Sequence, residues 1–499
     1  MKICFLSDTH LPYRDDAVQN DALTFLCGEA KKAGADYIAA AGDMTADGDP
    51  DAARRFLKAV ADTGLPAVIC PGNSDIRTAA TVNEMLSFTS PAVNVFGDFT
   101  LISAGDADRA FSPDALAALA EAGKNTAVMM HHPPETLKPE SAAALDGFHK
   151  RNPDAHIFYA HIHKSGTDGV FHSLPCADPD KAIGEEPGAL IFDTETGKSI
   201  TVHYPCPMPD GFCERLGFTC FDPETDLLYA ASRGIKHAEL RNIAFYGDIN
   251  KVLNGAAAFR STPGSTLSLH APDFLFDDEG RVRNTAEWKD FIDFACLLSA
   301  DRITVHTPRC SVKNFDNNIL RNELEKFINI HFNELPPRCI IGIENMHMTK
   351  GETPDGSHRF GYTPAECKAF AEFCRPLTGH TLGFNIDIGH ARNNAPFSEK
   401  YTLGAWYAEL GKSAVSYHIH QVINTPAGFE NHMPFTEPYG ALISLASFFK
   451  SIESGILNPA PAILEIRGAG EYRKSIDMLF DLADKKSGRH IAENIIQDL

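Results

Sequence analysis

The chain contains the stretch MKICFLSDTH (residues 1–10), in which a short apolar run ends directly in the triplet Asp8-Thr9-His10. Such a run, bounded at once by polar residues, predicts a buried β-strand. Its apolar part is too short for a signal peptide, so we expect the first strand of a folded domain. Aspartate and histidine are common metal-ligand types. The stretch therefore predicts a strand that delivers metal ligands at its carboxyl end.

Four further motifs follow the same rule within the first 205 residues, each directly after a predicted strand. They are Gly42-Asp43, Gly72-Asn73-Ser74-Asp75, His131-His132-Pro133 and Ala160-His161-Ile162-His163. Since α/β folds build their sites at the carboxyl ends of strands, we expect these side chains to meet at one sheet edge. Carboxylate, amide and imidazole groups there suit two metal ions, with Asp43 as the bridging ligand and an activated water that attacks phosphorus in line.

The order and spacing of these five motifs resemble the calcineurin-like metallophosphoesterase family over residues 1–204. The resemblance implies an α/β sandwich that hydrolyses phosphate esters. It also implies one metal bound by Asp8, His10, Asp43 and His163, and a second bound by Asp43, Asn73, His131 and His161. Asp43, His132 and His161 would then be the catalytic residues around the charged phosphorus.

Two positions depart from the family pattern, and one of them, Ala160 in place of the usual glycine in the last motif, is a mild change. The third motif usually carries a histidine after Gly-Asn, and here Ser74 replaces it. In the family that histidine contacts the phosphate, so Ser74 becomes a substrate-binding candidate. Family branches with a small residue at this place resemble phosphodiesterases, which favours diesters over monoesters as substrates.

A breaker-rich segment, PCPMPDG (residues 205–211), predicts a domain boundary. We therefore expect one domain over residues 1–205 and a second over residues 211–499. The second half holds eight predicted strands with room for a helix in most gaps, the requirement of a (β/α)8 TIM barrel. The predicted strands are 217–221, 237–241, 266–270, 302–306, 340–344, 382–387, 414–418 and 462–466.

Ligand-type residues stand at the ends of these barrel strands, which should converge on one mouth. They resemble the xylose isomerase-like superfamily, which includes sugar epimerases and endonuclease IV. The resemblance implies a single-metal set of Glu344, Asp387, His418 and Glu465, with Glu344 and Glu465 also serving as acid and base in an epimerase. Four more histidines, with Glu430 where endonuclease IV carries Asp, would complete a trinuclear site: His270, His306, His390 and His432.

Two further residues are assigned to substrate binding. His420 shares a strand face with His418, because side chains alternate along a strand, and one of the two can support the other. Arg467 shares a face with Glu465 and could clamp a phosphate or carboxylate, or form a structural ion pair. His270 and His306 could alternatively bind substrate hydroxyls.

Several functions therefore remain open for the barrel. It could hydrolyse a small phosphorylated or cyclic substrate, isomerise or epimerise a sugar with one metal, cleave nucleic acid as endonuclease IV does, or bind a ligand without turnover. The fusion suggests that both sites act on a sugar phosphate or nucleotide-like metabolite in one pathway.

Composition narrows the choice of partners. The chain has 499 residues and a formal net charge of −21, which argues against nonspecific binding to nucleic acid phosphates. Mixed His, Asp and Glu ligands favour Mn, Fe or Zn over Ca or Mg, with two ions expected in the first domain and one to three in the barrel. The 12 cysteines form no CxxC pair, so we expect reduced thiols and a cytoplasmic location. No stretch approaches the eighteen or more apolar residues of a membrane helix, so we expect no membrane contact. A homo-oligomer is suggested only by analogy with other barrels.

Overall fold

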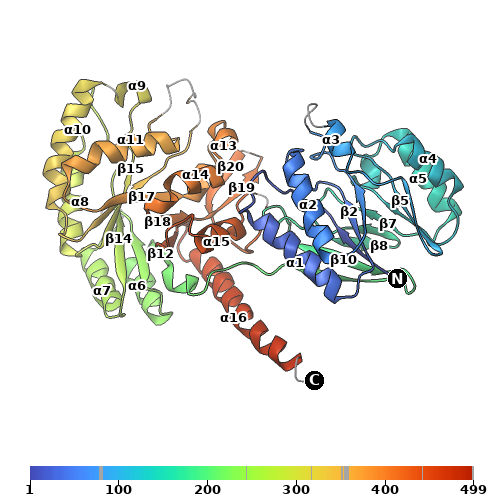
Figure 1. The fold of residues 1–499 in the computed structure, drawn as a ribbon. Coiled ribbons are helices and arrows are strands. Elements are labelled where there is room, and N and C mark those ends of the chain that lie inside the picture. The colour runs from blue at the N-terminus through green and yellow to red at the C-terminus, as the bar shows by residue number, and fades with distance from the viewer. Residues whose placement is uncertain are drawn as a thin grey trace. The chain divides into compact units, whose positions relative to one another are not determined.

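A computed structural model describes residues 1–496 except 78–81, 243, 245, 316, 350–351, 353–358, 427 and 441. The chain separates into two compact units (Figure 1). The first contains Met1–Pro207 together with Tyr439–Lys450, and the second contains Met208–Pro438 with Ser451–Leu499. The short segment Tyr439–Lys450 thus belongs to the first unit, although the sequence interpretation assigned it to the barrel.

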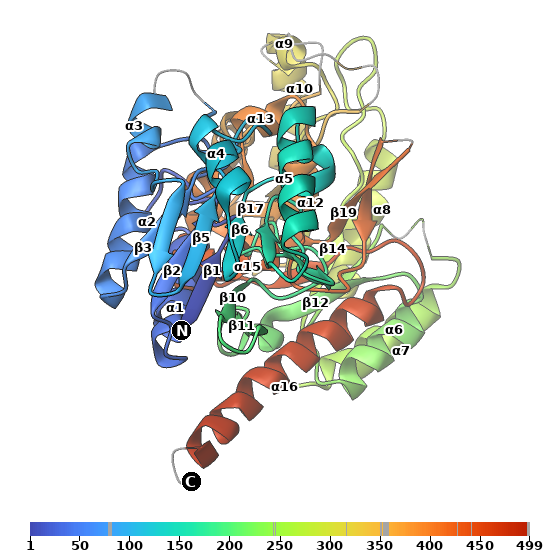
Figure 2. The same ribbon diagram turned by 90° about the vertical axis from the view of Figure 1, so that its right-hand side faces the viewer.

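The first unit is built on two β-sheets, and Figure 2 labels strands of both, such as β2 and β6. The five-stranded sheet has the order β11-β10-β1-β2-β3 and the six-stranded sheet the order β4-β5-β6-β7-β9-β8. The first sheet comprises β1 (Lys2–Leu6), β2 (Tyr37–Ala41), β3 (Ala67–Cys70), β10 (Gly188–Asp193) and β11 (Lys198–His203). The second comprises β4 (Val93–Phe96), β5 (Phe99–Ser103), β6 (Thr126–Met129), β7 (Ile157–Tyr159), β8 (Gly166–Asp168) and β9 (Phe171–Ser173).

One apolar core joins the two sheets. Strands of both contribute buried side chains to it, among them Phe5 of β1, Met129 of β6 and Phe158 of β7. The rings of Phe5 and Phe158 stack with their centroids 4.1 Å apart. A second core lies where the six-stranded sheet packs against helices α4 (Pro113–Glu121) and α5 (Pro139–Arg151). The prediction of an α/β sandwich is confirmed. The motifs were expected at the edge of one sheet, and the strands that carry them belong to two sheets.

Two helices of the first unit begin with a side-chain cap followed by proline. Asp49 and Ser112 cap α2 and α4 with their side chains, each followed by a proline at the first helical position. Besides α4 and α5, the helices are α1 (Val18–Lys32), α2 (Pro50–Thr63) and α3 (Val82–Leu86).

The second unit is a closed parallel barrel with the strand order β12-β13-β14-β15-β16-β17-β18-β21. The (β/α)8 prediction is therefore confirmed, and the predicted bounds of its third to sixth strands coincide with the observed ones. The strands are β12 (Leu216–Cys220), β13 (His237–Leu240), β14 (Thr266–His270), β15 (Arg302–His306), β16 (Ile340–Glu344), β17 (Leu382–Asp387), β18 (Ala414–Ile419) and β21 (Ala462–Leu464).

Helices connect these strands and cover the barrel (Figure 1). The longer ones are α6 (Pro223–Ser232), α7 (Ile249–Arg260), α8 (Thr285–Leu297), α10 (Asn318–His331), α11 (Pro364–Cys374), α14 (Leu403–Leu410) and α16 (Tyr472–Ile496). Three are short: α9 (Val312–Phe315), α12 (Ile388–Arg392) and α13 (Phe397–Lys400). Most of α15 (Leu445–Glu453) lies in the segment Tyr439–Lys450 that belongs to the first unit.

A β-hairpin beyond β18 was not predicted from the sequence. It pairs β19 (Gln421–Thr425) with β20 (Gly428–Met433) in antiparallel fashion. Much of it is exposed, so it lacks the apolar alternation that marks a half-buried strand. The hairpin matters because it carries His432 back to the mouth of the barrel.

The expectations about membrane contact and thiols can be compared with the helices and cysteines of the structure. No helix within the described ranges is long and apolar enough to cross a membrane. Ten of the cysteines are buried, Cys213 is half-buried and Cys296 is exposed, and all of them carry free thiols.

Candidate metal centres

The five motifs of the first unit meet at one end of the paired sheets. Three follow β1, β2 and β3 of the five-stranded sheet, and two follow β6 and β7 of the six-stranded sheet. Five non-glycine residues of these motifs have left-handed backbone conformations: Asp8, His10, Asp43, His161 and His163, with φ between 41° and 72°. Such conformations cost about 1–3 kcal/mol each and concentrate at functional sites.

The first cluster consists of Asp8, His10 and His163, whose candidate ligand atoms lie within 4.8 Å of one another. The Nε2 atoms of His10 and His163 are 3.2 Å apart. Asp8 Oδ1 lies 3.6 Å from His163 Nε2 and 3.9 Å from His10 Nε2. Burial lowers the pKa of His163 to about 4, so its ring is neutral at pH 7 and has a lone pair to offer.

The second cluster contains the imidazoles of His131 and His161 and the amide of Asn73. His131 Nε2 lies 3.2 Å from both His161 Nδ1 and Asn73 Oδ1. His131 Nδ1 donates to the carbonyl of Ala41 at 2.9 Å, so Nε2 is the ring nitrogen that faces the cluster. Burial lowers the pKa of His161 to about 4, so this ring too is neutral at pH 7.

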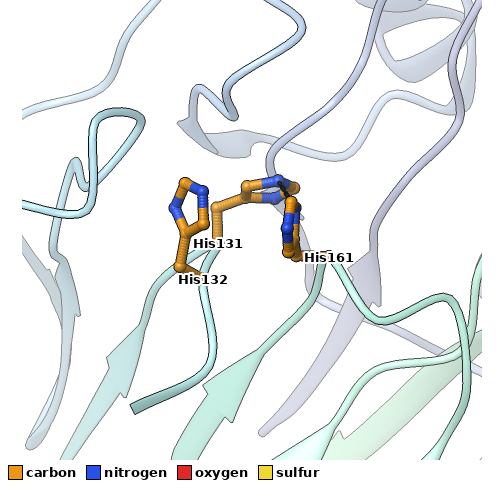
Figure 3. A group of neighbouring side chains, drawn as sticks. All are labelled: His131, His132 and His161. Atoms are coloured by element: carbon orange, nitrogen blue, oxygen red, sulfur yellow. Dashed lines mark hydrogen bonds between the residues drawn. The ribbon is translucent and has the colours of Figure 1, made fainter. Parts of the chain in front are cut away.

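His132 lies beside this second cluster (Figure 3). Its Nδ1 donates to the Asp106 carbonyl at 2.9 Å, and its ring centroid is 4.6 Å from that of His161. Its Nε2 is therefore the nitrogen that can accept a proton or a metal.

Asp43 lies between the two clusters. Its Oδ1 is 3.4 Å from His131 Nε2, and its Oδ2 is 3.8 Å from His10 Nε2. Burial would raise the pKa of this carboxyl, but the hydrogen bond and charge of His131 outweigh it and hold the pKa far below its usual range. Asp43 is thus an ionised carboxylate with one oxygen toward each cluster, the arrangement of a bridging ligand.

Two aspartates that we did not assign from the sequence support these loops. Asp75 accepts the main-chain N–H groups of Met44, Thr45 and Gly72, and so ties the loop after β2 to the loop after β3. Asp106 accepts the main-chain N–H groups of His131 and His132 at 2.7 and 2.8 Å. Asp75 belongs to the third motif, Gly72-Asn73-Ser74-Asp75. Asp106 lies shortly after β5, and an acidic residue in that position is only weak evidence for a role in the site.

Two glycines permit the close approach of the motifs. A Cβ on Gly42, where φ is +91°, would lie 2.5 Å from His131 Nδ1, and one on Gly72 would lie 2.2 Å from Asp43 Oδ1. No side chain can occupy either position without displacing a ligand.

Ser74, the predicted substrate contact, is buried. Its main-chain N–H donates to Asp43 Oδ1 at 2.8 Å, and its hydroxyl lies 3.5 Å from His10 Nδ1. The structure therefore places Ser74 among the ligand side chains, where it orients Asp43.

In the barrel, Glu344 occupies the centre of the predicted ligands and is fully buried. Its Oε2 lies 3.3 Å from His270 Nε2 and 3.5 Å from His306 Nε2. Its Oε1 lies 3.1 Å from His418 Nδ1 and 3.5 Å from His390 Nδ1. Like Asp43, this glutamate presents each oxygen to a different group of histidines.

Glu465 completes the group around His418. Its Oε2 is 3.0 Å from His418 Nδ1 and 3.6 Å from His432 Nδ1. The ligand atoms of His270, His418 and Glu465 lie within 4.8 Å of one another, as do those of His270, His306 and Glu344.

A further group consists of His390, His420 and His432, which are all buried. His420 Nε2 lies 3.1 Å from Asp387 Oδ1, and its Nδ1 accepts the main-chain N–H of His432 at 2.9 Å. Asp387 Oδ1 also caps α12 by accepting the His390 N–H. A Cβ on Gly389 would lie 1.8 Å from His420 Cε1, so glycine is required there. His420 thus lies among the candidate ligands, although we assigned it to substrate binding.

Two residues named in the sequence analysis have exposed side chains. Glu430 is exposed on β20, and Arg467 is exposed beyond β21, where its main-chain N–H donates to the His432 carbonyl. Burial lowers the pKa of the neighbouring His432, and the positive charge of the exposed Arg467 side chain contributes to that shift.

Charge balance supports cation binding in the barrel. Burial opposes ionisation of Glu344, but the facing imidazoles of His418, His270 and His306 hold its pKa well below the usual range. Burial likewise opposes protonation of His306, but hydrogen bonds to Asp273 and Glu344 outweigh it and raise its pKa to about 10. Protons thus occupy the position between carboxylate and imidazole that a divalent cation would take.

Unpartnered carboxylate oxygens in the described part of the chain indicate that the ligand groups of the first unit and of the barrel both fit divalent metal ions. Asp8 Oδ1, Glu344 Oε2 and Glu465 Oε2 are buried oxygens that accept no well-formed hydrogen bond from the described residues. A buried carboxylate oxygen without a partner is costly, and a cation is the group that satisfies several such oxygens and imidazole nitrogens together.

Comparison with known proteins identifies the first unit. Residues 1–165 match the calcineurin-like phosphoesterase family. The UDP-2,3-diacylglucosamine hydrolase of Escherichia coli O139:H28 is 34% identical over an alignment of 118 residues, and the match covers 21% of this chain and 48% of that protein. The chain thus spans about half the length of the curated relatives it matches.

Two solved structures resemble the second unit. Endonuclease IV from Thermus thermophilus has 15% sequence identity and a TM-score of 0.39, covering 54% of this chain and 99% of its own. A xylose isomerase-like TIM barrel protein from Mycobacterium smegmatis has 15% identity and a TM-score of 0.35, covering 52% and 86%. The barrel fold itself rests on the strand pairing described above.

Proposed function

We propose that this chain, whose first 165 residues form a calcineurin-like phosphoesterase domain, is a metal-dependent phosphoesterase that prefers phosphodiesters. The observation that carries the proposal is the position of Asp43, with Oδ1 toward His131 and Oδ2 toward His10. A carboxylate placed in this way can bridge two cations and hold them at a fixed separation.

The residues that would hold the ions are Asp8, His10, Asp43 and His163 for one, and Asp43, Asn73, His131 and His161 for the other. Two divalent cations would supply Lewis-acid activation of phosphoryl oxygens and of water. His132 keeps its proton on Nδ1 through Asp106, so its Nε2 can accept a proton or a hydrogen bond from the substrate. His161 is half-buried and neutral, which lets it contact the phosphate without a charge of its own.

Two observations favour a diester or diphosphate substrate. Ser74 stands where the family usually carries a histidine, and it is buried against Asp43 and His10, so the site has one proton donor fewer for a monoester leaving group. The matched relative from Escherichia coli is a hydrolase whose name gives a UDP-linked sugar as substrate. A small phosphorylated metabolite is therefore the proposed partner.

The test compares Asp43→Asn with a matched control, Asp47→Asn, which changes an exposed aspartate four residues away. Turnover of bis(4-nitrophenyl) phosphate and 4-nitrophenyl phosphate is measured with Mn²⁺. We expect the wild type to hydrolyse the diester faster, Asp47→Asn to match it, and Asp43→Asn to lose at least about 100-fold. Full turnover by Asp43→Asn would refute the proposal.

For the barrel we propose a second metal-dependent activity on a sugar phosphate or nucleotide-like metabolite, which would make the chain bifunctional. The supporting observation is Glu344, which faces four histidines through its two oxygens. That number of ligands exceeds what one ion needs and favours a multinuclear hydrolase of the endonuclease IV kind. The competing functions are a single-metal isomerase or epimerase, in which Glu344 and Glu465 act as acid and base, and a sensor without turnover.

Glu344→Gln separates these alternatives, because it removes charge at the centre of the site and keeps the side-chain volume. Product analysis on sugar phosphates and on phosphodiesters is done with the full chain. An active barrel predicts that one product disappears while the first domain still hydrolyses its test substrate. Unchanged products from Glu344→Gln would favour the sensor.

A further inference from the structure

Two carboxylates outside the predicted ligand set each contact a barrel histidine at the ring nitrogen that does not face Glu344. Asp273, in the loop after β14, places Oδ1 2.6 Å from His306 Nδ1. Glu239, on β13, places Oε1 3.0 Å from His418 Nε2. Glu239 is only 1% exposed, and neither residue stands at a family-like ligand position in the sequence.

The two histidines use opposite ring nitrogens toward Glu344. His306 presents Nε2 to Oε2 at 3.5 Å, and His418 presents Nδ1 to Oε1 at 3.1 Å. A neutral imidazole has one N–H and one lone pair. Asp273 accepts the Nδ1–H of His306, which leaves the lone pair on the Nε2 that faces Glu344. At His418 the hydrogen bond is instead made by Nδ1 to Glu344 Oε1, and among the described residues the Nε2 near Glu239 makes none.

Each carboxylate is itself held in place by a second donor. Arg309 Nη1 donates to Asp273 Oδ2 at 2.7 Å, and Thr304 Oγ1 donates to Glu239 Oε2 at 2.8 Å. Both carboxylates therefore have one oxygen anchored and the other directed at a histidine.

The distance at His306 distinguishes a hydrogen bond from shared metal ligation. Atoms bound to one ion at about 2.1 Å lie roughly 3 Å or more apart. The 2.6 Å between His306 Nδ1 and Asp273 Oδ1 is shorter than that, and it is the distance of a charge-assisted hydrogen bond. Asp273 is thus not a second ligand on the same ion.

We propose that Asp273 is a positioning residue that fixes His306 in the tautomer with its lone pair on Nε2, so that this nitrogen and Glu344 Oε2 can share a divalent cation. The inference rests on the proposed metal-binding function of the barrel. Carboxylates of this kind raise the basicity of a ligating histidine and set its ring orientation, and their loss costs about 10- to 100-fold in metal affinity.

The experiment uses the full chain in an Asp43→Ala background, so that the ions of the first domain are removed. Co²⁺ affinity is measured by chelator competition, and the visible absorption of bound Co²⁺ reports the ligand set. Asp273→Ala should weaken binding about 10- to 100-fold and change the absorption. Asp273→Asn, whose amide oxygen still accepts the His306 N–H, should recover most of the affinity. Asp278→Asn, an exposed aspartate of the same loop, is the control.

Thermal unfolding of each variant identifies any that does not fold, and the half-buried position of Asp273 favours folding of its variants. Wild-type affinity and absorption in Asp273→Ala would overturn the inference, as would equal losses in Asp273→Asn and Asp273→Ala. If the barrel of the parent chain binds no Co²⁺, the proposed metal function fails instead, and the two failures are thereby distinguished.

Discussion

The Nε2 atoms of His10 and His163 face each other at 3.2 Å. Two neutral imidazoles can meet at this distance only if one of them donates a proton or if both bind the same cation. Asp8 Oδ1 lies within 3.9 Å of both and accepts no hydrogen bond of its own from the described residues. Neighbouring imidazole nitrogens and a carboxylate oxygen without a hydrogen-bond partner among the described residues also occur around Glu344. Both units therefore have the arrangement expected of a metal-binding site.

Metal content is the first prediction. Protein purified without chelators should contain about two ions in the first domain, because Asp43 divides its oxygens between two groups of ligands. The barrel should contain roughly three, because Glu344 divides its oxygens in the same way and a further ligand group is formed by His390, His420 and His432. Elemental mass spectrometry gives the ratio of ions to chain. A total near three would instead indicate a mononuclear barrel and favour the isomerase alternative. Removal of the ions with a chelator should abolish phosphoesterase activity, and added Mn²⁺ should restore it.

Gly42→Ala tests the close contact between the two sheets of the first unit. The new methyl group would lie 2.5 Å from His131 Nδ1, so we expect loss of the ion held by His131 and loss of activity. Gly64→Ala is the matched control, because Gly64 also has a positive φ of +77° but has no atom within 4 Å of the added Cβ. Both variants should lose about 1–2 kcal/mol from the left-handed backbone. Equal metal contents in the two variants would contradict the steric argument.

Gly389→Ala tests the position of His420 in the barrel. The added Cβ would overlap His420 Cε1 at 1.8 Å and displace the ring from Asp387. We expect fewer barrel ions per chain with unchanged hydrolysis of the diester by the first domain. Gly379→Ala, where the nearest neighbour of a Cβ would be Asn333 Oδ1 at 3.9 Å, should retain all ions. Normal metal content in Gly389→Ala would show that His420 can move without loss of the site.

His237 should make the barrel less stable in acid. Burial lowers the pKa of its imidazole to about 4, below the ordinary value of 6.5. As the pH falls from 6.5 to 4, the unfolded chain takes up this proton before the folded chain does, so the free energy of unfolding decreases. Above pH 6.5 the contribution is fully present. Urea unfolding in chelator, at several pH values, should show a shallower decrease for His237→Gln than for the wild type. Parallel curves would rule out His237 as a source of the acid sensitivity.

Much of the fold could be predicted from local sequence. The barrel strands β14 to β17 are short apolar runs with a polar residue at the carboxyl end, and their bounds agree with the prediction. The hairpin of β19 and β20 could not be predicted, because its residues are exposed and its pairing depends on where β18 ends. For the same reason, the sequence did not predict that on β20 His432 is buried at the site while Glu430 is exposed.

The sequence by itself determined which chemical groups are available and at which strand ends they lie. Asp8, Asp43 and Glu344 each follow or end an apolar strand, and a strand end is a local property. Only the tertiary structure decided that His131 and His10 face opposite oxygens of Asp43, and that Asp273 and Glu239 lie behind His306 and His418. These contacts join strands that are distant in the chain, so they depend on strand pairing and packing, which no local pattern specifies.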